Sequence, residues 1–496
     1  MSADVPSGWT VPATAPRRVW PSLTAIWPVP QRIPDRRLIG GAAASGVLAA
    51  TVVGADPGLG IVLTVAAMTA AVWPSTAGHR SPRLLGFLAL GWLLVLPTLV
   101  LTAPWVIGLD LLAALGSFAA ALVPGSTWVA VLVTPLALPF AAVRGRSWIR
   151  PSLLRLFGRR AGYAPASAWM FGLCAAAVGL TVFGALFSSA DPAFHHLLDE
   201  AAPNVQLRLV PARICFAAVV AIGVLCSGFV ALSPPRLDAL HPRPSRTAAR
   251  QVWLTPVLAL VVLFTAFVIV QFTVLFAGNQ HILRTAGLTY ADYAHQGFGQ
   301  LVAVTVLTLL VVGAVTRWAP KQTRVDRRLL RLTLGLLCLL TLVIVASALR
   351  RLQLYDAAYG LTRLRVFAVA FVGWTGALLL LVLLAGLRLR GDWLPQAAVA
   401  SAGVALLVLT AANPDALIAR TAVSRYEHTG QIDAEYLAGL SADAAPAVRS
   451  LPAGMRGCVW MAMVPGPQDW RSWNLSRVRT ERLIPPAAGS APCFGS

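Results

Sequence analysis

Twelve acidic, basic, tyrosine and amide side chains stand near the ends of long apolar segments, on loops where they could form one polar assembly. They are Asp191, Tyr290, Asp292, Tyr293, Tyr359, Arg363, Arg365, Asn413, Asp415, Arg420, Arg425 and Tyr426. Loops held by a rigid helical scaffold are the usual place for functional residues. The alternative is that these residues cap helix ends, pair charges and dock the C-terminal segment. The sequence favours this structural role, since Asn and Asp at helix boundaries are ordinary capping residues.

Asp110 is a second candidate, because it lies near the middle of the apolar run Pro104–Val123. An ionisable side chain at membrane depth is costly, and by default it suggests ion or proton transport. A coupled transporter buries several such groups, whereas this chain has one clear example. Asp110 therefore supports a transporter weakly.

Metal and cofactor chemistry have little support in the spacing of the residues. The outward histidines, such as His195 and His281, belong to no HxxxH or HExxH pattern, and the cysteines form no CxxC pattern. Nucleotide-binding glycine loops and a GxSxG elbow are missing as well. We therefore expect no catalytic, cofactor-binding or metal site. Cys458 and Cys493 are the only cysteines after residue 412. They could form a disulfide in an oxidising space or remain two free thiols.

The composition shows which solvent must surround these residues. Of 496 residues, 57% are hydrophobic and 12% charged, whereas soluble proteins are about 25% charged. The formal net charge is +21, but the arginines fall in short clusters between apolar runs. This pattern indicates membrane topology instead of nucleic-acid binding. A soluble enzyme, a disordered chain and a fibrous repeat are excluded, and the lipid bilayer is the expected partner.

Twelve apolar runs approach the length of a membrane-spanning helix. They are Leu38–Val53, Leu59–Trp73, Leu84–Leu101, Pro104–Val123, Thr127–Val143, Ala166–Phe187, Leu209–Leu232, Trp253–Ala277, Gly299–Val315, Leu329–Leu349, Leu364–Leu387 and Leu394–Ala412. The run Thr127–Val143 is short and is expected to be broken by Pro135 and Pro139, so we interpret it as re-entrant, interfacial or fused with the preceding run. About 11 crossings then remain. A full set of twelve would export the Arg-rich N-terminus.

The basic residues divide the loops into two sides. Six alternate segments carry 24 Arg and Lys residues, and the segments between them, 189–208, 278–298 and 350–363, carry 5. Positive loops stay in the cytoplasm, so the N-terminus is expected inside and the C-terminus outside. The predicted division is a cytoplasmic Arg-rich segment (1–37), N-terminal spans (38–143), an Arg-rich cytoplasmic loop (144–165), a membrane core (166–412) and an extracytoplasmic helical tail (413–496).

Four motifs of the later spans follow one another in the order LFSSAD (186–191), GLTYADY (287–293), YGLTRLR (359–365) and NPDALIAR (413–420). In the tail, Asp433, Tyr436–Leu437, Leu440–Ala444 and Ser472–Arg477 continue the pattern. Over about residues 170 to 480 the chain resembles the bacterial polytopic membrane proteins grouped as domain of unknown function 4153 and its relative 4173. The resemblance implies a membrane-embedded fold and no particular activity. His295 follows Tyr293-Ala294 where relatives tend to carry Arg.

The expected fold is therefore an all-α polytopic integral membrane bundle of a bacterial cytoplasmic membrane, with a small extracytoplasmic helical tail. Three classes of function stay open. The first is a non-enzymatic role in envelope assembly or sensing through the outward face, with a membrane or envelope protein as partner. The second is a transporter for a small solute. The third is a transferase using a lipid-linked substrate, for which Asp56, Asp191 and Asp292 could supply outward acids.

Overall fold

The computed structural model describes residues 23–31, 34–53, 56–157, 205–240, 249–276, 290–388, 391–464 and 469–484, with the single positions 176, 179, 183 and 187. This part of the chain contains helices and no β-strand. The α-helices are α1 (Leu23–Ile26), α2 (Arg36–Val52), α3 (Leu59–Val72), α4 (Pro82–Val95), α5 (Pro104–Leu122), α6 (Trp128–Arg144), α7 (Arg146–Phe157), α10 (Val205–Leu232), α11 (Arg250–Phe276), α13 (Tyr290–Trp318), α14 (Arg324–Tyr359), α15 (Arg363–Arg388), α16 (Leu394–Ala411), α17 (Pro414–Thr429), α18 (Ala434–Ala438), α19 (Ala453–Met463) and α20 (Leu475–Leu483). Short 3₁₀ turns are η1 (Trp73–Thr76), η2 (Leu96–Leu99), η3 (Leu237–Leu240), η4 (Ala442–Ala444), η5 (Ala447–Ser450) and η6 (Trp470–Ser472). The prediction of an all-α fold is confirmed.

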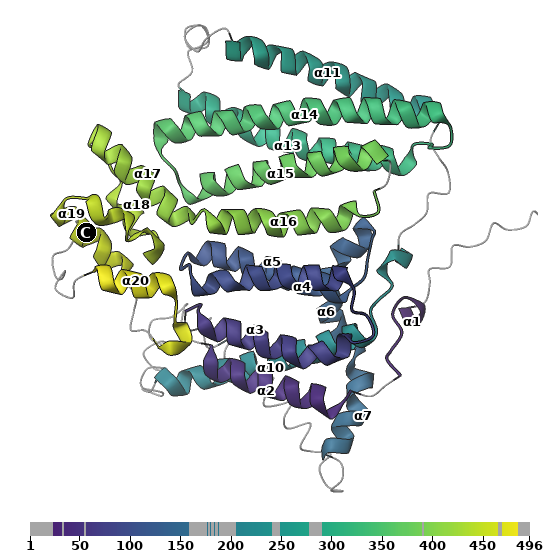
Figure 1. Cartoon of the computed structure of the whole chain (residues 1–496), viewed down its shortest axis with the longest axis vertical. Helices are drawn as coiled ribbons and strands as arrows, with labels where there is room; N and C mark the ends of the chain where they lie inside the picture. The colour runs from purple at the N-terminus through teal and green to yellow at the C-terminus, as the bar shows by residue number, and fades with distance from the viewer. Residues whose placement is uncertain are drawn as a thin grey trace, which may run out of the picture.

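The long helices lie side by side with their axes nearly aligned (Figure 1). Among the described residues, 9 helices are long and apolar enough to cross a membrane, or up to 10 if α6 and α7 together form one bent span. Helix α2, with 17 residues, runs alongside them and is slightly shorter. This arrangement supports a polytopic membrane bundle. The number of 11 crossings stays a prediction, because most of the run Ala166–Phe187 lies outside the described residues.

Two groups of helices build the core. On one side, α11, α13, α14 and α15 enclose residues such as Val257, Leu337 and Leu379. On the other side, α2, α6 and α10 pack around Phe229, while α4 and α5 pack around Leu94. Helix α16 joins the groups, since it lies between α15 and the α4–α5 pair in Figure 1 and its side chains pack into the second core.

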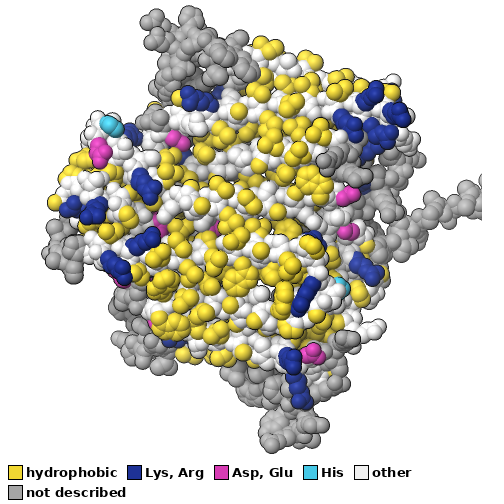
Figure 2. All heavy atoms as spheres, viewed as in Figure 1, with side chains coloured by type: hydrophobic (Ala, Val, Ile, Leu, Met, Phe, Trp, Pro, Cys, Tyr) yellow, Lys and Arg dark blue, Asp and Glu magenta, His cyan; other side chains and the backbone are white. Residues whose placement is uncertain are grey.

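The outer surface of the bundle is apolar. Leu132, Leu332 and Leu364 are 74%, 70% and 76% exposed. Figure 2 shows a broad belt of hydrophobic side chains across the middle of the molecule, with basic side chains gathered toward the helix ends. Water would make such a belt unfavourable, whereas the hydrocarbon of a bilayer makes it favourable. The protein is thus a multi-pass membrane protein.

Pro135 and Pro139 lie inside α6 and do not interrupt it, so the expectation that these prolines break the segment is wrong. The break comes at Gly145 instead, where α6 and α7 meet with a bend of 47°. Helix α6 crosses the direction of the long helices near one end of the bundle (Figure 1). Its Ala130 and Ala137 pack in the core beside Phe229, and Leu132 is exposed. Fusion of this segment with α5 is excluded by the non-helical residues 123–127.

The tail after Ala411 forms a compact helical unit at the ends of the long helices (Figure 1). Its core includes Ile418, Leu437, Val448 and Val459, and the Trp460 indole donates to the Ala445 carbonyl at 3.1 Å. Asn413 caps α17, and the α17 helix ends at Gly430. Residues 442–450 form the turns η4 and η5, and no α-helix runs from Asp443 to Val448.

Candidate functional site

Asp415 is the centre of the polar cluster that joins the tail to the bundle. The chain turns sharply before it, because Asn413 adopts a left-handed φ of 48° and its Oδ1 accepts from the Ala416 amide at 3.3 Å. Pro414 then begins α17, as suits the first helical position. This turn directs the Asp415 side chain into the protein, where it is 0% exposed.

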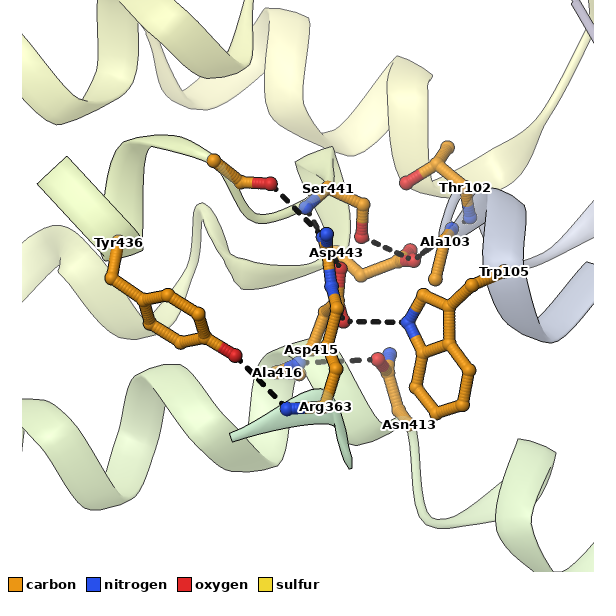
Figure 3. Close-up of polar contacts among 11 residues, drawn as sticks. Thr102, Ala103, Trp105, Arg363, Asn413, Asp415, Ala416, Tyr436, Ser441 and Asp443 are labelled. Carbon is orange, nitrogen blue, oxygen red and sulfur yellow. Dashed lines mark hydrogen bonds and ion pairs between the residues drawn. The ribbon is translucent and has the colours of Figure 1, made fainter. Parts of the chain in front are cut away.

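Four donors surround the Asp415 carboxylate (Figure 3). Oδ1 accepts from the Nε of Arg363 and from the Nε1 of Trp105, both at 3.1 Å. Oδ2 accepts from the Nη2 of Arg363 at 2.7 Å and from the Ser441 amide at 2.9 Å. The contact with Arg363 is therefore bidentate, which is the strongest geometry for a guanidinium and a carboxylate.

This environment keeps Asp415 ionised. Burial opposes the charged form, but the hydrogen bonds from Arg363, Ser441 and Trp105 outweigh it and hold the pKa of Asp415 below its ordinary value. A carboxylate offers about four acceptor positions, and all are occupied here. A general acid or base needs a pKa near the working pH and an open position for the reacting proton. Asp415 has neither, so it serves as an anchor.

Arg363 binds the tail at three points. Besides Asp415, its Nη2 donates to the Gly439 carbonyl at 3.0 Å, and its backbone amide donates to the Tyr436 hydroxyl at 2.9 Å. Arg363 is the first residue of α15. A cation at a helix N-terminus is unfavourable for the helix dipole, and the Asp415 carboxylate compensates for it.

We call each polar contact between the tail and the membrane helices a joint. The first is the contact between Asp415 and Arg363, and Asp443 makes a second joint on the N-terminal half of the chain. Its Oδ2 accepts from the amides of Thr102 and Ala103 at 2.8 and 3.0 Å and from the Ser441 hydroxyl at 3.0 Å (Figure 3). Thr102 and Ala103 directly precede α5, whose own N-cap residue Ala103 has no capping side chain. Asp443 thus caps a helix more than 300 residues earlier.

Asn474 makes a third joint at the same corner. Its Nδ2 donates to the carbonyls of Thr98 and Leu101 at 2.8 and 2.7 Å, and its Oδ1 accepts from the first amides of α20. The neighbouring Trp473 carbonyl accepts from the Leu59 amide at 3.2 Å. The tail therefore holds the start of α15 in one half of the bundle and the starts of α3 and α5 in the other half.

Arg365 belongs to a separate group at the α14–α15 turn. Its guanidinium donates to the Gly360 carbonyl and lies 4.3 Å from the centre of the Tyr355 ring. Tyr359 lies against Tyr355, with ring centres 4.7 Å apart. Gly360 has a φ of +80°, and a Cβ there would lie 3.1 Å from an Arg425 nitrogen. The turn thus needs glycine for its backbone conformation.

The remaining predicted residues fall into three sets. Arg420 is exposed and lies outside the joint around Asp415, while Tyr426 packs against the tail core. Tyr290, Asp292 and Tyr293 lie in the first turn of α13, but their side chains are outside the described residues, as is Asp191. Their part in one assembly with the tail stays a prediction.

Asp110 lies in the interior, as its sequence position suggested. It is 0% exposed, and its Oδ2 accepts from the Thr410 hydroxyl of α16 at 2.8 Å. Its Oδ1 has no hydrogen-bond partner among the described residues. The pair links α5 to α16.

Of the two tail cysteines, Cys458 lies among the described residues. Cys458 of α19 is in a disulfide, but Cys493 lies outside the described residues, so their pairing stays a prediction. Across the described part of the chain, no group of three or more His, Cys, Asp or Glu side chains could hold a metal ion.

Sequence reasoning missed the partners that complete the joint. Trp105 and Thr102 carry no functional pattern in the sequence, since an indole and a backbone amide become important only through contact. Ser441 stands in the stretch Leu440–Ala444 of the resemblance but acts through its backbone amide. Asn474 stands in the run SWNLSR, which the resemblance did pick out. Its position before a polar helix was the available indication of a cap.

Comparison with known proteins agrees with this architecture. Residues 45–451 match the family model described as Domain of unknown function (DUF4153). This match covers most of the chain, and the chain therefore belongs to that family. Neither the curated proteins nor the solved structures include a match.

Proposed function

We propose that this protein has no enzymatic activity and works in envelope assembly or sensing through the face that carries its tail. In this proposal the protein lies in a bacterial cytoplasmic membrane, with its N-terminus inside and the tail outside. The unequal distribution of arginines between alternate loops supports this orientation.

The occupied carboxylate of Asp415 carries the proposal. It is fully buried, and each of its oxygens accepts two hydrogen bonds from the protein itself. A transferase needs an acid that can reach its substrate. Of the three acids named for transfer chemistry, Asp56 is described, and its Oδ1 lies 3.5 Å from the Nη2 of Arg477, where it supports the tail contact.

The outer surface of the tail is available for a partner. Trp470 and Trp473 are 56% and 42% exposed, and Arg479 and Arg482 of α20 are exposed as well. Tryptophan and arginine are among the residue types enriched at binding hot spots. The rigid attachment of the tail to both halves would transmit a bound partner's effect to the membrane helices.

Two experiments test the proposal. Alkaline phosphatase fused after Tyr426 should be active and fused after Arg246 inactive, and the reverse pattern would overturn the orientation. A deletion strain should show an altered envelope profile that wild-type protein restores. Trp470→Ser should fail to restore it at normal protein levels, while Lys321→Gln, at an exposed site between α13 and α14, should succeed. Full complementation by Trp470→Ser would contradict a role for the tail surface.

Transport of a small solute is the second candidate, favoured by the unpartnered Oδ1 of Asp110. A buried carboxylate with a free oxygen could bind a proton or cation. Asp110→Asn keeps the shape and the Thr410 contact but removes the charge. Normal complementation by Asp110→Asn would exclude transport that depends on this carboxylate, whereas loss of function with normal folding would favour it over the first proposal.

A further inference from the structure

A hollow between α3, α4, α5 and α10 is lined almost wholly by apolar side chains. Its volume is about 290 Å³. Its walls include Val65 and Met68 of α3, Leu88 of α4, Phe118 of α5 and Gly223 of α10. All four helices are candidate membrane spans, so the hollow lies at the depth of the lipid.

The hollow opens to the outside of the bundle. Leu115, which lines it, is 56% exposed. Apolar cavities of about 150 Å³ already hold a benzene ring, and this one is larger. Its shape depends on Gly223, where a side chain would enter the hollow: a Cβ there would lie 3.6 Å from the Met68 Cε.

The wall carries three hydroxyl side chains, and two of them, Thr69 and Thr76, already donate to carbonyls of their own chain segment, while the third is Ser227 of α10. Thr69 donates to the Val65 carbonyl and Thr76 to the Trp73 carbonyl, each at 2.8 Å within its own helix. The ligand that suits the interior is therefore a hydrocarbon chain, for which no hydrogen bond has to be broken.

A cation stands beside the hollow. The Arg80 guanidinium lies 4.4 Å from the ring centre of Trp73, which lines the hollow. Arg80 is exposed and pairs with no carboxylate among the described residues. The neighbouring Arg83 is already engaged by the carbonyls of Ala120 and Val123, at 2.9 and 2.5 Å. Arg80 is thus available to bind an anion, and its position near a Trp is typical of the headgroup region of a bilayer.

From these observations we infer that the hollow binds one acyl chain of an anionic phospholipid, whose headgroup phosphate is held by Arg80. The lipid comes from the leaflet on the Arg-rich side. Apolar burial supplies the affinity, and the guanidinium supplies the preference for a negative headgroup.

The full-length protein can be placed in nanodiscs of equal phosphatidylglycerol and phosphatidylcholine, transferred to mild detergent and analysed by native mass spectrometry. Wild-type protein should retain lipid, with phosphatidylglycerol favoured about five-fold, the effect of one cation near the surface. Gly223→Leu should lose retained lipid of both kinds. Gly86→Leu is the matched control, because Gly86 of α4 is exposed with no neighbour within 4 Å of an added Cβ.

Arg80→Gln should retain lipid and lose the headgroup preference. A second measurement does not depend on filling the hollow. The fluorescence of Trp73 is obtained by subtracting the fluorescence of the Trp73→Phe variant from that of wild-type protein, and phosphatidylglycerol with brominated chains should quench it. Retention of no lipid by wild-type protein, equal retention by Gly223→Leu, or absence of quenching would each overturn the site. An unchanged preference in Arg80→Gln would overturn the role of Arg80.

Discussion

Asp443 caps helix α5 from outside that helix, with its Oδ2 3.0 Å from the amide nitrogen of Ala103. The first amides of any helix lack partners within the helix. Ala103 has no side chain that could accept hydrogen bonds from these amides, and Pro104 has no amide hydrogen to donate. The tail therefore completes a membrane helix of the N-terminal half.

Removing this cap should destabilise the protein. Asp443→Ala leaves the part-buried amide of Thr102 and the buried amide of Ala103 without this acceptor, and the expected cost is about 1–2 kcal/mol, at the upper end for a cap. Asp433→Ala is the control, since Asp433 also accepts an amide hydrogen bond, from Tyr436, but is exposed and local. The apparent Tm in detergent measures the stability of both variants. Equal Tm values for the two variants would contradict the role of Asp443.

Loss of Arg363 should have a larger effect. Arg363→Ala leaves the Asp415 carboxylate buried without its charge partner, and removing one member of a buried pair costs about 3–5 kcal/mol. Because the Arg363 side chain is 34% exposed, water offsets part of this, and we expect about 3 kcal/mol. Arg420→Ala, an exposed site in α17, should stay within about 0.5 kcal/mol. Arg363→Lys should fall between them, since it keeps the charge but not the bidentate contact. A wild-type Tm for Arg363→Ala would refute the joint.

The joint should weaken in acid. The pKa of Asp415 is lower in the folded protein than the ordinary Asp value of about 3.9. The stabilisation is therefore complete well above pH 4, and it is lost as the pH falls through the ordinary value and then through the lower native pKa. Apparent Tm measured between pH 7 and pH 3 should fall more steeply for wild-type protein than for Asp415→Asn. Parallel curves would show that Asp415 does not contribute to the acid sensitivity.

The disulfide of Cys458 should involve Cys493. Both are in the tail, which we propose to lie on the oxidising side. Protein alkylated before reduction should yield a peptide pair joining the two cysteines, and Cys493→Ser should make Cys458 reactive. Cys226, which is free and buried, serves as the internal reference. A Cys458 that stays protected in Cys493→Ser would exclude this pairing.

The sequence was sufficient for the class of fold because apolar runs of membrane length can be recognised one at a time. It also indicated Arg363, Asn413 and Asp415, since polar residues at helix boundaries stand out in an apolar chain. It could not indicate that Asp443 serves α5, because a cap supplied from a distance leaves no local pattern. The prolines of α6 led to a wrong prediction of a break for a related reason. In a membrane-embedded helix, neighbouring helices can satisfy the backbone groups that a proline leaves unpaired.

The contact between Asp443 and Ala103 also sets an order of events during synthesis. Ala103 leaves the ribosome 340 residues before Asp443, which at about 5–20 residues per second is a delay of roughly 20 to 70 s. During that time the bundle is inserted while the start of α5 still lacks the Asp443 acceptor. A chain terminated before residue 443 never gains this acceptor, so its α5 keeps the incomplete start that a full-length chain loses when the tail docks.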